Sequence, residues 1–227
     1  MRPLPLMLFA AGFGTRMGAL TQNRPKPLIE VGGKPLIDHA LAMARSAGVA
    51  KIVVNLHYLG PQIAAHLHGS DIQLSWETEQ ILETGGGLRA ALPLLGVGPV
   101  MTLNTDAVWS GQNPLTQLLA AWDPAKMDAL LLLLPCDKAL GHTGHGDFLL
   151  DPDGRISRAN GADAPVYLGA QILKTESLSA ISEPVFSLNR LWDISIANNR
   201  AFGLIHQGGW CDVGRPEGIA LAESLDV

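Results

Sequence analysis

Short, strongly apolar segments that alternate with helix-like segments constrain the fold of this chain more than any other feature. In the first 135 residues the strand-like segments cover 4–10, 51–56, 72–76, 100–104 and 129–134. The helix-like segments between them cover 35–48, 59–67, 87–95 and 114–122. Buried strands separated by helices of about ten residues predict an α/β fold, in which helices cover both faces of a mostly parallel, mixed sheet.

The pattern changes after Pro135, where shorter segments follow one another without a linker, an internal repeat or a low-complexity stretch. The segments predicted there are a hairpin over 148–156, strands over 166–173 and 201–205, helices over 187–198 and 216–225, and a short apolar stretch over 210–214. We therefore expect a single domain over residues 1–227. Its C-terminal portion, residues 136–227, elaborates the substrate-facing side of its N-terminal portion, residues 1–135.

The charge balance argues against a nucleic-acid partner, because 16 Lys and Arg stand against 21 Asp and Glu, for a net charge of −5, with no basic run. The apolar run 129–134 is far shorter than the ~20 residues that a membrane-spanning helix needs, so we expect no membrane partner. Neither Cys136 nor Cys211 has a CxxC or CxxH neighbour. This favours a reducing, cytoplasmic compartment over a zinc site or a disulfide framework. Without a strong interface signature, a monomer or a weak homodimer is expected.

A Gly-rich loop directly follows the first predicted strand and reads AAGFGTRM over 10–17, with RPKPL following over 24–28. Glycines after a buried strand let backbone N–H groups approach phosphates closely. Arg16 and Lys26 add cations that can contact the same phosphates. The prolines on either side of Lys26 restrict its backbone and fix the direction of its side chain. The loop therefore predicts a ligand that carries phosphate groups.

Two other Gly-rich motifs fail on spacing. A dinucleotide-binding fingerprint needs a third glycine at position 17, where this chain has Met17. A Walker-type P-loop needs Gly-Lys-Ser/Thr after a strand, whereas Gly33-Lys34 is followed by Pro35. An ordinary strand-to-helix turn with surface cations is the structural alternative, and it would suffice for a Gly-x-Gly pattern alone.

Residues 9–28 read FAAGFGTRMGALTQNRPKPL and resemble the signature of the sugar-1-phosphate nucleotidyltransferases, which usually reads LAAGxGTRMxxLTxxxPKPL. The similarity continues through ETGGG at 83–87, an aspartate after the fourth strand and CDVGRPE at 211–217, so it covers essentially the whole chain. NLHY at 55–58, ETGGG and GDF at 146–148 most resemble the N-acetylmuramate-1-phosphate uridylyltransferases, which act in bacterial cell-wall sugar recycling. The resemblance implies a Rossmann-like, GT-A-like nucleotidyltransferase fold.

The resemblance also implies the substrates and the cofactor. A nucleoside triphosphate, with UTP expected, would react with a sugar 1-phosphate, with N-acetylmuramate 1-phosphate expected, in the presence of Mg2+. The N-terminal portion would bind the nucleotide, and the C-terminal portion would bind the sugar and supply the second metal ligand. Asp106 and Asp212 match the aspartates that hold magnesium in the family, although either one alone would more often be a turn or helix-cap residue.

The remaining site residues are assigned by the same matching. Arg16 and Lys26 are expected to be catalytic, Arg16 on the leaving β- and γ-phosphates and Lys26 near the α-phosphate. The expected nucleotide-binding residues are Ala11, Gly12, Gly14, Thr15, Gln80 and Gly85, and the expected sugar-binding residues are Gly146, Asp147 and Gly169. Gln80 is expected to contact the base, because an amide can pair with both a donor and an acceptor on uracil.

One position departs from the family pattern. Thr105 stands where the family usually has glycine, and its Cβ is expected to lie where the sugar nucleotide passes. A separate acidic group, Glu77, Glu79 and Glu83, is typical of a solvated face.

Two other functions remain open at this stage. One is guanylyl, thymidylyl or cytidylyl transfer to a hexose or heptose 1-phosphate. The other is a non-catalytic, nucleotide-sensing relative, which the presence of all four charged residues at 16, 26, 106 and 212 disfavours.

Overall fold

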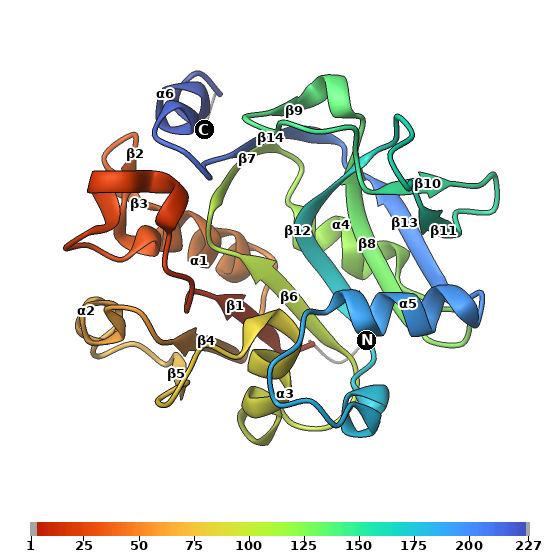
Figure 1. Ribbon diagram of the computed structural model, residues 1–227, viewed down its shortest axis with the longest axis horizontal. Helices are drawn as coiled ribbons and strands as arrows, with labels where there is room; N and C mark the ends of the chain where they lie inside the picture. The colour runs from red at the N-terminus through yellow and green to blue at the C-terminus, as the bar shows by residue number, and fades with distance from the viewer. Residues whose placement is uncertain (1–3, 226–227) are drawn as a thin grey trace.

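The computed structural model describes residues 4–225. Its main element is a seven-stranded sheet in the order β13-β8-β12-β6-β1-β4-β5 (Figure 1). The strands are β1 (Leu6–Phe9), β4 (Ile52–Leu56), β5 (Gln73–Trp76), β6 (Val100–Asn104), β8 (Ala129–Leu134), β12 (Val166–Leu173) and β13 (Ala201–Ile205). Only β12 runs antiparallel to its neighbours in this sheet. The predicted mostly parallel, mixed sheet is therefore confirmed.

Helices cover both faces of the sheet, as the apolar strands predict. They are α1 (Leu36–Ser46), α2 (Gly60–His66), α3 (Glu83–Leu95), α4 (Pro114–Ala121), α5 (Asn189–Ala197) and α6 (Glu217–Glu223). Alternation along β1 separates two cores: Leu6 and Leu8 pack with α1, α2 and α4, whereas Met7 packs with α3 and α5. None of these helices, within residues 4–225, is long and apolar enough to cross a membrane.

A second, three-stranded sheet lies beside the first, in the order β7-β14-β9. It consists of β7 (Ala107–Gly111), β9 (Ala139–Leu140) and β14 (Gly208–Asp212). The stretch 210–214 therefore supplies the end of a strand, and its partners β7 and β9 are not predicted from the sequence. A third core joins this sheet to the Gly-rich loop and α6, through Met17, Val108, Cys211, Val213 and Ala222.

Smaller elements complete the chain. Two short hairpins are formed by β2 (Glu30–Val31) with β3 (Lys34–Pro35) and by β10 (Phe148–Leu150) with β11 (Ile156–Arg158). Single 3₁₀ turns or pairs of turns cover Thr15–Thr21, Lys26–Leu28, Cys136–Lys138 and Glu176–Ala180.

The start of α3 differs from the sequence prediction. The glycines at 85–87 predict a helix from Gly87, but α3 begins at Glu83. The N–H groups of Gly85 and Gly86 both donate to the carbonyl of Phe186, at 2.8 and 3.0 Å. A cap from a segment about 100 residues away therefore extends the helix, and local sequence does not reveal such a cap.

One cluster of ion pairs links three strands of the main sheet. Asp128, just before β8, contacts Lys174, just after β12, and Arg200, just before β13, each at 2.9 Å. Burial by itself raises the pKa of Asp128, but the hydrogen bonds and charges of Lys174 and Arg200 outweigh burial and hold this pKa below its usual value.

The lowered pKa predicts a pH-dependent stability. The unfolded chain takes up the Asp128 proton at a higher pH than the folded chain does, so the stabilisation is complete at neutral pH and is lost as pH falls through the folded pKa. Asp128→Asn should lower the free energy of unfolding by about 1 kcal/mol at pH 7, and by less in acid. Urea titrations across this range measure the difference. Asp163→Asn, at a side chain that is 97% exposed, is the control. If the difference in the free energy of unfolding between the wild type and Asp128→Asn is as large in acid as at pH 7, the lowered pKa of Asp128 is wrong.

Candidate active site

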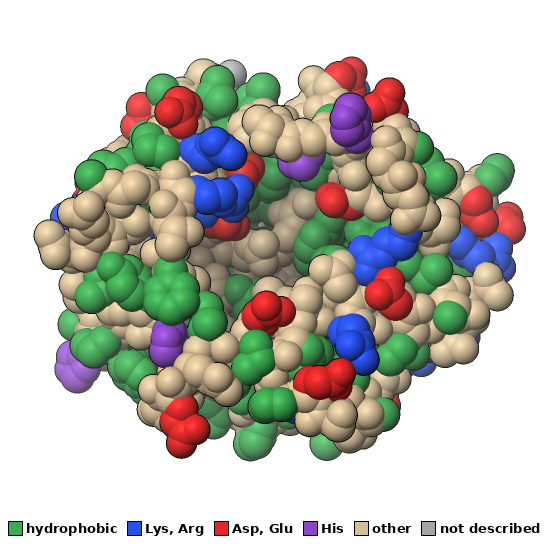
Figure 2. Space-filling model, viewed as in Figure 1, with side chains coloured by type: hydrophobic (Ala, Val, Ile, Leu, Met, Phe, Trp, Pro, Cys, Tyr) green, Lys and Arg blue, Asp and Glu red, His purple; other side chains and the backbone are tan. Residues whose placement is uncertain are grey.

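A cavity of about 300 Å³ opens at the carboxyl ends of the central parallel strands. Figure 2 shows the hollow at the centre of one face, with basic side chains on one rim and acidic side chains close to them. Asn55, the penultimate residue of β4, and Asn104, the last residue of β6, both pair in register with Phe9 of β1, and all three residues line the cavity. The position agrees with the rule that ligands of open α/β sheets bind beyond the carboxyl ends of the strands.

The Gly-rich loop forms one wall of the cavity. Gly12, Gly14 and Thr15 line it, as does Ala11. Gly14 has φ 66°, a backbone conformation that favours glycine, and a Cβ there would be crowded, at 3.0 Å from both Lys26 Cβ and Thr21 Cγ2. A Cβ on Gly12 would meet no atom within 4 Å, which leaves the backbone at this point open to a ligand. The structure therefore brings the predicted phosphate-binding loop into the cavity.

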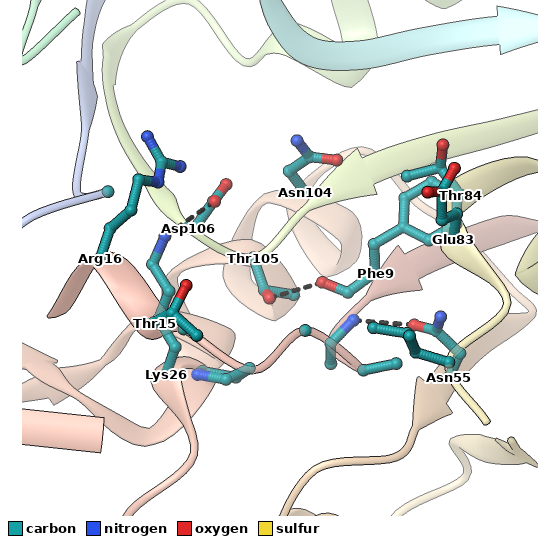
Figure 3. Close-up of a pocket in the computed structure, with 17 residues that line it drawn as sticks. Phe9, Thr15, Arg16, Lys26, Asn55, Glu83, Thr84, Asn104, Thr105 and Asp106 are labelled. Carbon is teal, nitrogen blue, oxygen red and sulfur yellow. Dashed lines mark hydrogen bonds and ion pairs between the residues drawn. The ribbon is translucent and has the colours of Figure 1, made fainter. Parts of the chain in front are cut away.

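Lys26 and Asp106 form the closest ion pair in the cavity. Lys26 Nζ donates to Asp106 Oδ2 at 2.8 Å, and Lys26 is only 9% exposed (Figure 3). Pro25 holds an extended backbone directly before Lys26, with φ −67° and ψ 144°. A buried ammonium that is fixed by its own backbone and by a carboxylate is preorganised for a ligand that carries negative charge.

The second sheet brings Asp212 beside Asp106. Asp212 pairs with Ala107 across the β7–β14 ladder, and the N–H of Val213 donates to the carbonyl of Asp106 at 2.9 Å. Arg16 Nη1 lies 3.9 Å from Asp212 Oδ2, although the Arg16 side chain is largely exposed. Two acids that are about 100 positions apart in the chain thus lie together with one buried and one exposed cation.

Asp212 has a raised pKa in this arrangement. Burial, followed by the negative charge of Asp106, raises the pKa of Asp212, and the charges of Lys26, Arg16 and His142 oppose this increase only in part. A further cation would relieve the repulsion. Oxygen ligands from one or two carboxylates, completed by water and phosphate oxygens, are the set that magnesium prefers.

Asp106 and Asp212 would supply only part of the ligands of a magnesium ion. No group of three or more His, Cys, Asp or Glu side chains in residues 4–225 is arranged to hold a metal ion. Water and phosphate oxygens would complete the ligands of a magnesium ion at Asp106 and Asp212.

Comparisons with known proteins show the family to which the chain belongs. Residues 6–143 match the model of the MobA-like NTP transferase domain. The chain is 41% identical to the N-acetylmuramate alpha-1-phosphate uridylyltransferase of Caulobacter vibrioides, over 98% of this chain and 96% of that protein. It is 36% identical to the enzyme of the same name from Neisseria meningitidis serogroup B, over 96% of each chain. The chain belongs to the sugar-1-phosphate nucleotidyltransferase family.

The fold agrees with more distant members. The UDP-glucose pyrophosphorylase from Acinetobacter baumanii superimposes with a TM-score of 0.79 over 97% of this chain and 92% of that chain, at 17% identity. The Rossmann-like nucleotidyltransferase fold that the sequence predicts is therefore confirmed.

The position that departs from the family pattern has an unexpected orientation. Thr105 lines the cavity, but its hydroxyl donates to the carbonyl of Phe9 at 2.7 Å, and the residue is 3% exposed. The side chain thus joins the end of β6 to the end of β1. That its Cβ lies where the sugar nucleotide passes stays a prediction.

The neighbours of the expected base-binding residues, Gln80 and Gly85, form another wall of the cavity. Ile81, Glu83 and Thr84 line the cavity, whereas Gln80 and Gly85 do not. Gly85 is buried, and a Cβ there would overlap the ring of Phe186, so packing alone accounts for glycine at this position. Glu83 has φ 59°, a left-handed backbone that is uncommon for glutamate and that directs its side chain toward the cavity (Figure 3).

Glu77 corrects one prediction. A solvated acidic face is expected at Glu77, Glu79 and Glu83, and Glu79 and Glu83 are exposed as expected. Glu77, in contrast, is 3% exposed and hydrogen-bonded on both carboxylate oxygens, to the side chain of Asn55 and the backbone of Leu82. The bond to Asn55 cannot be recognised from the local sequence, because Asn55 lies on another strand, 22 residues away.

The expected sugar-binding residues do not line this cavity. Asp147 Oδ2 accepts a hydrogen bond from the N–H of Tyr167 at 2.8 Å. Gly169, with φ 80°, lies against Asn104, and a Cβ there would be 2.8 Å from Asn104 Cγ. Gly146 has φ 95°, and its Cβ would overlap the carbonyl oxygen of Ala164. Backbone packing thus explains both glycines, and their contact with a sugar stays a prediction.

The cavity also contains residues that the sequence analysis does not assign. They are Phe9, Pro27, Asn55, Ile81, Glu83, Thr84, Asn104 and Gly214. Asn55 and Asn104 carry the clearest signal, because each is an asparagine at or next to the carboxyl end of a largely apolar strand. Such strand ends are where α/β folds place ligands.

The glycines of the C-terminal portion provide a stability test. Gly146→Ala should lower the free energy of unfolding by about 3 kcal/mol, from backbone strain together with the overlap with Ala164. Gly161→Ala is the matched control, because Gly161 has a similar φ of 88° but no atom within 4 Å of the added Cβ. It should cost about 1 kcal/mol from strain alone. Equal losses in urea titrations would show that the overlap is relieved without cost.

Proposed function

We propose that the protein transfers a uridylyl group from UTP to N-acetylmuramate 1-phosphate, releasing pyrophosphate, with magnesium as the cofactor. The observation that carries the proposal is the meeting of Lys26, Asp106, Asp212 and Arg16 beside the open Gly-rich loop. The 41% and 36% identities to proteins named for this reaction support the choice of substrates.

The proposed reaction needs no covalent intermediate. A sugar-phosphate oxygen attacks the α-phosphorus of the triphosphate in line, and the bond between that phosphorus and the oxygen that joins it to the β-phosphate breaks, so that the β- and γ-phosphates leave together as pyrophosphate. The attacking oxygen is already ionised, so no general base is required. Catalysis then depends on positioning the triphosphate against the sugar 1-phosphate and on neutralising the charge of both.

Each charged residue has a distinct role in this proposal. Lys26, buried and fixed, neutralises charge near the α-phosphate and the incoming sugar phosphate. Arg16, largely exposed at the mouth of the cavity, contacts the β- and γ-phosphates as they leave as pyrophosphate. Backbone N–H groups of 12–15 cradle the triphosphate. Asp106 and Asp212 would hold magnesium, which when bound neutralises phosphate charge and relieves their mutual repulsion.

Lys26 gives the sharpest single test. Lys26→Ala should lower kcat by roughly 10²- to 10³-fold, because it removes a fixed charge from the reacting phosphates. Pyrophosphate release measures turnover, and thermal unfolding checks the fold. Lys126→Ala is the control, since Lys126 is an exposed cation that pairs with Asp123 at the surface. Near-normal turnover in Lys26→Ala would overturn the proposed mechanism.

A substrate panel tests the identity of the reaction. Pyrophosphate release is measured for UTP, CTP, GTP and dTTP, each with N-acetylmuramate 1-phosphate, glucose 1-phosphate and mannose 1-phosphate, with and without magnesium. We expect rapid turnover only with UTP, N-acetylmuramate 1-phosphate and magnesium.

Other outcomes of the panel are equally informative. Preference for another triphosphate or sugar favours the guanylyl, thymidylyl or cytidylyl alternatives. Nucleotide binding without turnover of any pair favours a nucleotide-sensing protein. Full activity in the presence of a magnesium chelator would exclude the assigned role of Asp106 and Asp212.

A further inference from the structure

We propose that Asn55 and Glu77 are positioning residues, which fix the base-side segment 78–82 to the start of the Gly-rich loop through a buried chain of hydrogen bonds. The proposal rests on the proposed function, because it assigns this device to the nucleotide half of the same cavity. Neither residue needs to touch the reacting phosphates for it to hold.

The chain of hydrogen bonds runs across two strands. The N–H of Ala10 donates to Asn55 Oδ1 at 2.8 Å, and Asn55 Nδ2 donates to Glu77 Oε1 at 2.7 Å. The second carboxylate oxygen, Glu77 Oε2, accepts from the N–H of Leu82 at 2.7 Å. Ala10 begins the Gly-rich loop, and Leu82 directly precedes α3. Three short bonds therefore connect opposite walls of the cavity.

Burial makes the chain specific. Asn55 and Glu77 are each 3% exposed. A buried carboxylate without donors is strongly destabilising, so Glu77 is retained here because both of its oxygens are satisfied. A buried network of this kind has one geometry of low free energy, so it fixes the backbone N–H groups at its two ends, those of Ala10 and Leu82, relative to each other.

The surrounding backbone closes around the pair. Gly87 of α3 lies so near that an added Cβ would be 2.6 Å from Glu77 Oε1 and 3.1 Å from Asn55 Nδ2. The backbone of Glu77 is held as well, because its carbonyl lies 2.6 Å from His57 Nδ1 and its N–H donates to Leu56 at 2.9 Å. The pair is thus clamped between β4, the residue after β5, and α3.

The ends of the chain show what it positions. Ala10 and Asn55 line the cavity, as do Ile81 and Glu83 on either side of Leu82. Segment 78–82 also contains Gln80, the residue expected to contact the base. A shift of Leu82 would therefore move the base-side wall relative to the phosphate-binding loop, and misplacement of this kind weakens binding of a ligand that spans both.

The donor and acceptor inventory permits a rescue experiment. In Glu77→Gln the new amide must face either Asn55 Nδ2 or the Leu82 N–H with its NH₂ group, so one donor meets another donor. In Asn55→Asp a second carboxylate meets Glu77. In the double variant Asn55→Asp/Glu77→Gln all bonds return: Asp accepts from Ala10 and from the Gln amide, and the Gln oxygen accepts from Leu82.

The experiment measures KM for UTP, KM for the sugar 1-phosphate, kcat, and the UTP-over-CTP ratio of kcat/KM for the wild type, both single variants and the double variant. Each single variant should raise KM for UTP about tenfold and lower the UTP-over-CTP ratio, with KM for the sugar phosphate changed less than about twofold. The double variant should recover most of the loss.

A control separates positioning from stability. Asn113→Asp removes a comparable side-chain amide, one that donates to the carbonyl of Met43 at 2.8 Å and lies outside this cavity. It should lower the melting temperature without changing either KM. If the single variants behave like Asn113→Asp, with reduced stability and unchanged KM for UTP, the proposal is wrong.

The remaining outcomes are also decisive. Should a single variant not fold, the double variant still tests the proposal, because a network restored in full must restore folding and KM together. A double variant that folds but keeps the raised KM overturns it. Absence of turnover in the wild type overturns the proposed function instead. If the wild type prefers another triphosphate, KM for that triphosphate is measured in the same four proteins in place of KM for UTP.

Discussion

The pairing of β7 with β14 is the constraint on which the charged side of the site depends. This ladder holds Asp212 opposite Ala107, and its continuation, the bond from the Val213 N–H to the Asp106 carbonyl, fixes two acids side by side against their mutual repulsion. The free energy for this comes from apolar burial elsewhere, since Met17, Val108 and Cys211 pack together beneath the strands. The same small core contains a residue of the Gly-rich loop, so the carboxylates and the loop are set by one piece of packing.

The main sheet could be predicted from the sequence because its strands are apolar enough to be recognised one at a time. Strands β7 and β9 could not, since β9 has only two residues and both exist through partners far along the chain. Among the site residues, the loop, Lys26, Asp106 and Asp212 follow from sequence pattern and do meet in the structure. Glu77 does not, because whether a glutamate is solvated or buried depends on a donor such as Asn55, which only tertiary structure supplies.

The motif glycines show why pattern matching and packing must be separated. Gly14 is needed where the loop passes Lys26 and Thr21, directly at the cavity. Gly85 and Gly146 are needed because Phe186 and Ala164 leave no space for a Cβ. A glycine can therefore be required at a site without touching a ligand, and a match to a family motif does not distinguish the two reasons.

The two walls of the cavity are stabilised in opposite ways, and the difference suits the proposed chemistry. On the phosphate side, Arg16 and Asp212 stay partly exposed, at 58% and 20% of their side chains, and their charges can reorganise when phosphates arrive and leave. On the base side, Asn55 and Glu77 are buried, and their hydrogen bonds are made to groups of the protein itself. The loosely paired ions Arg16 and Asp212 thus suit the phosphate side, where the charge of the ligand changes during the reaction. The buried hydrogen bonds of Asn55 and Glu77 suit the base side, where the geometry of the wall must stay fixed. Thr105 joins the two at their common base, where its hydroxyl ties the strand that precedes Asp106 to the strand that precedes Ala10.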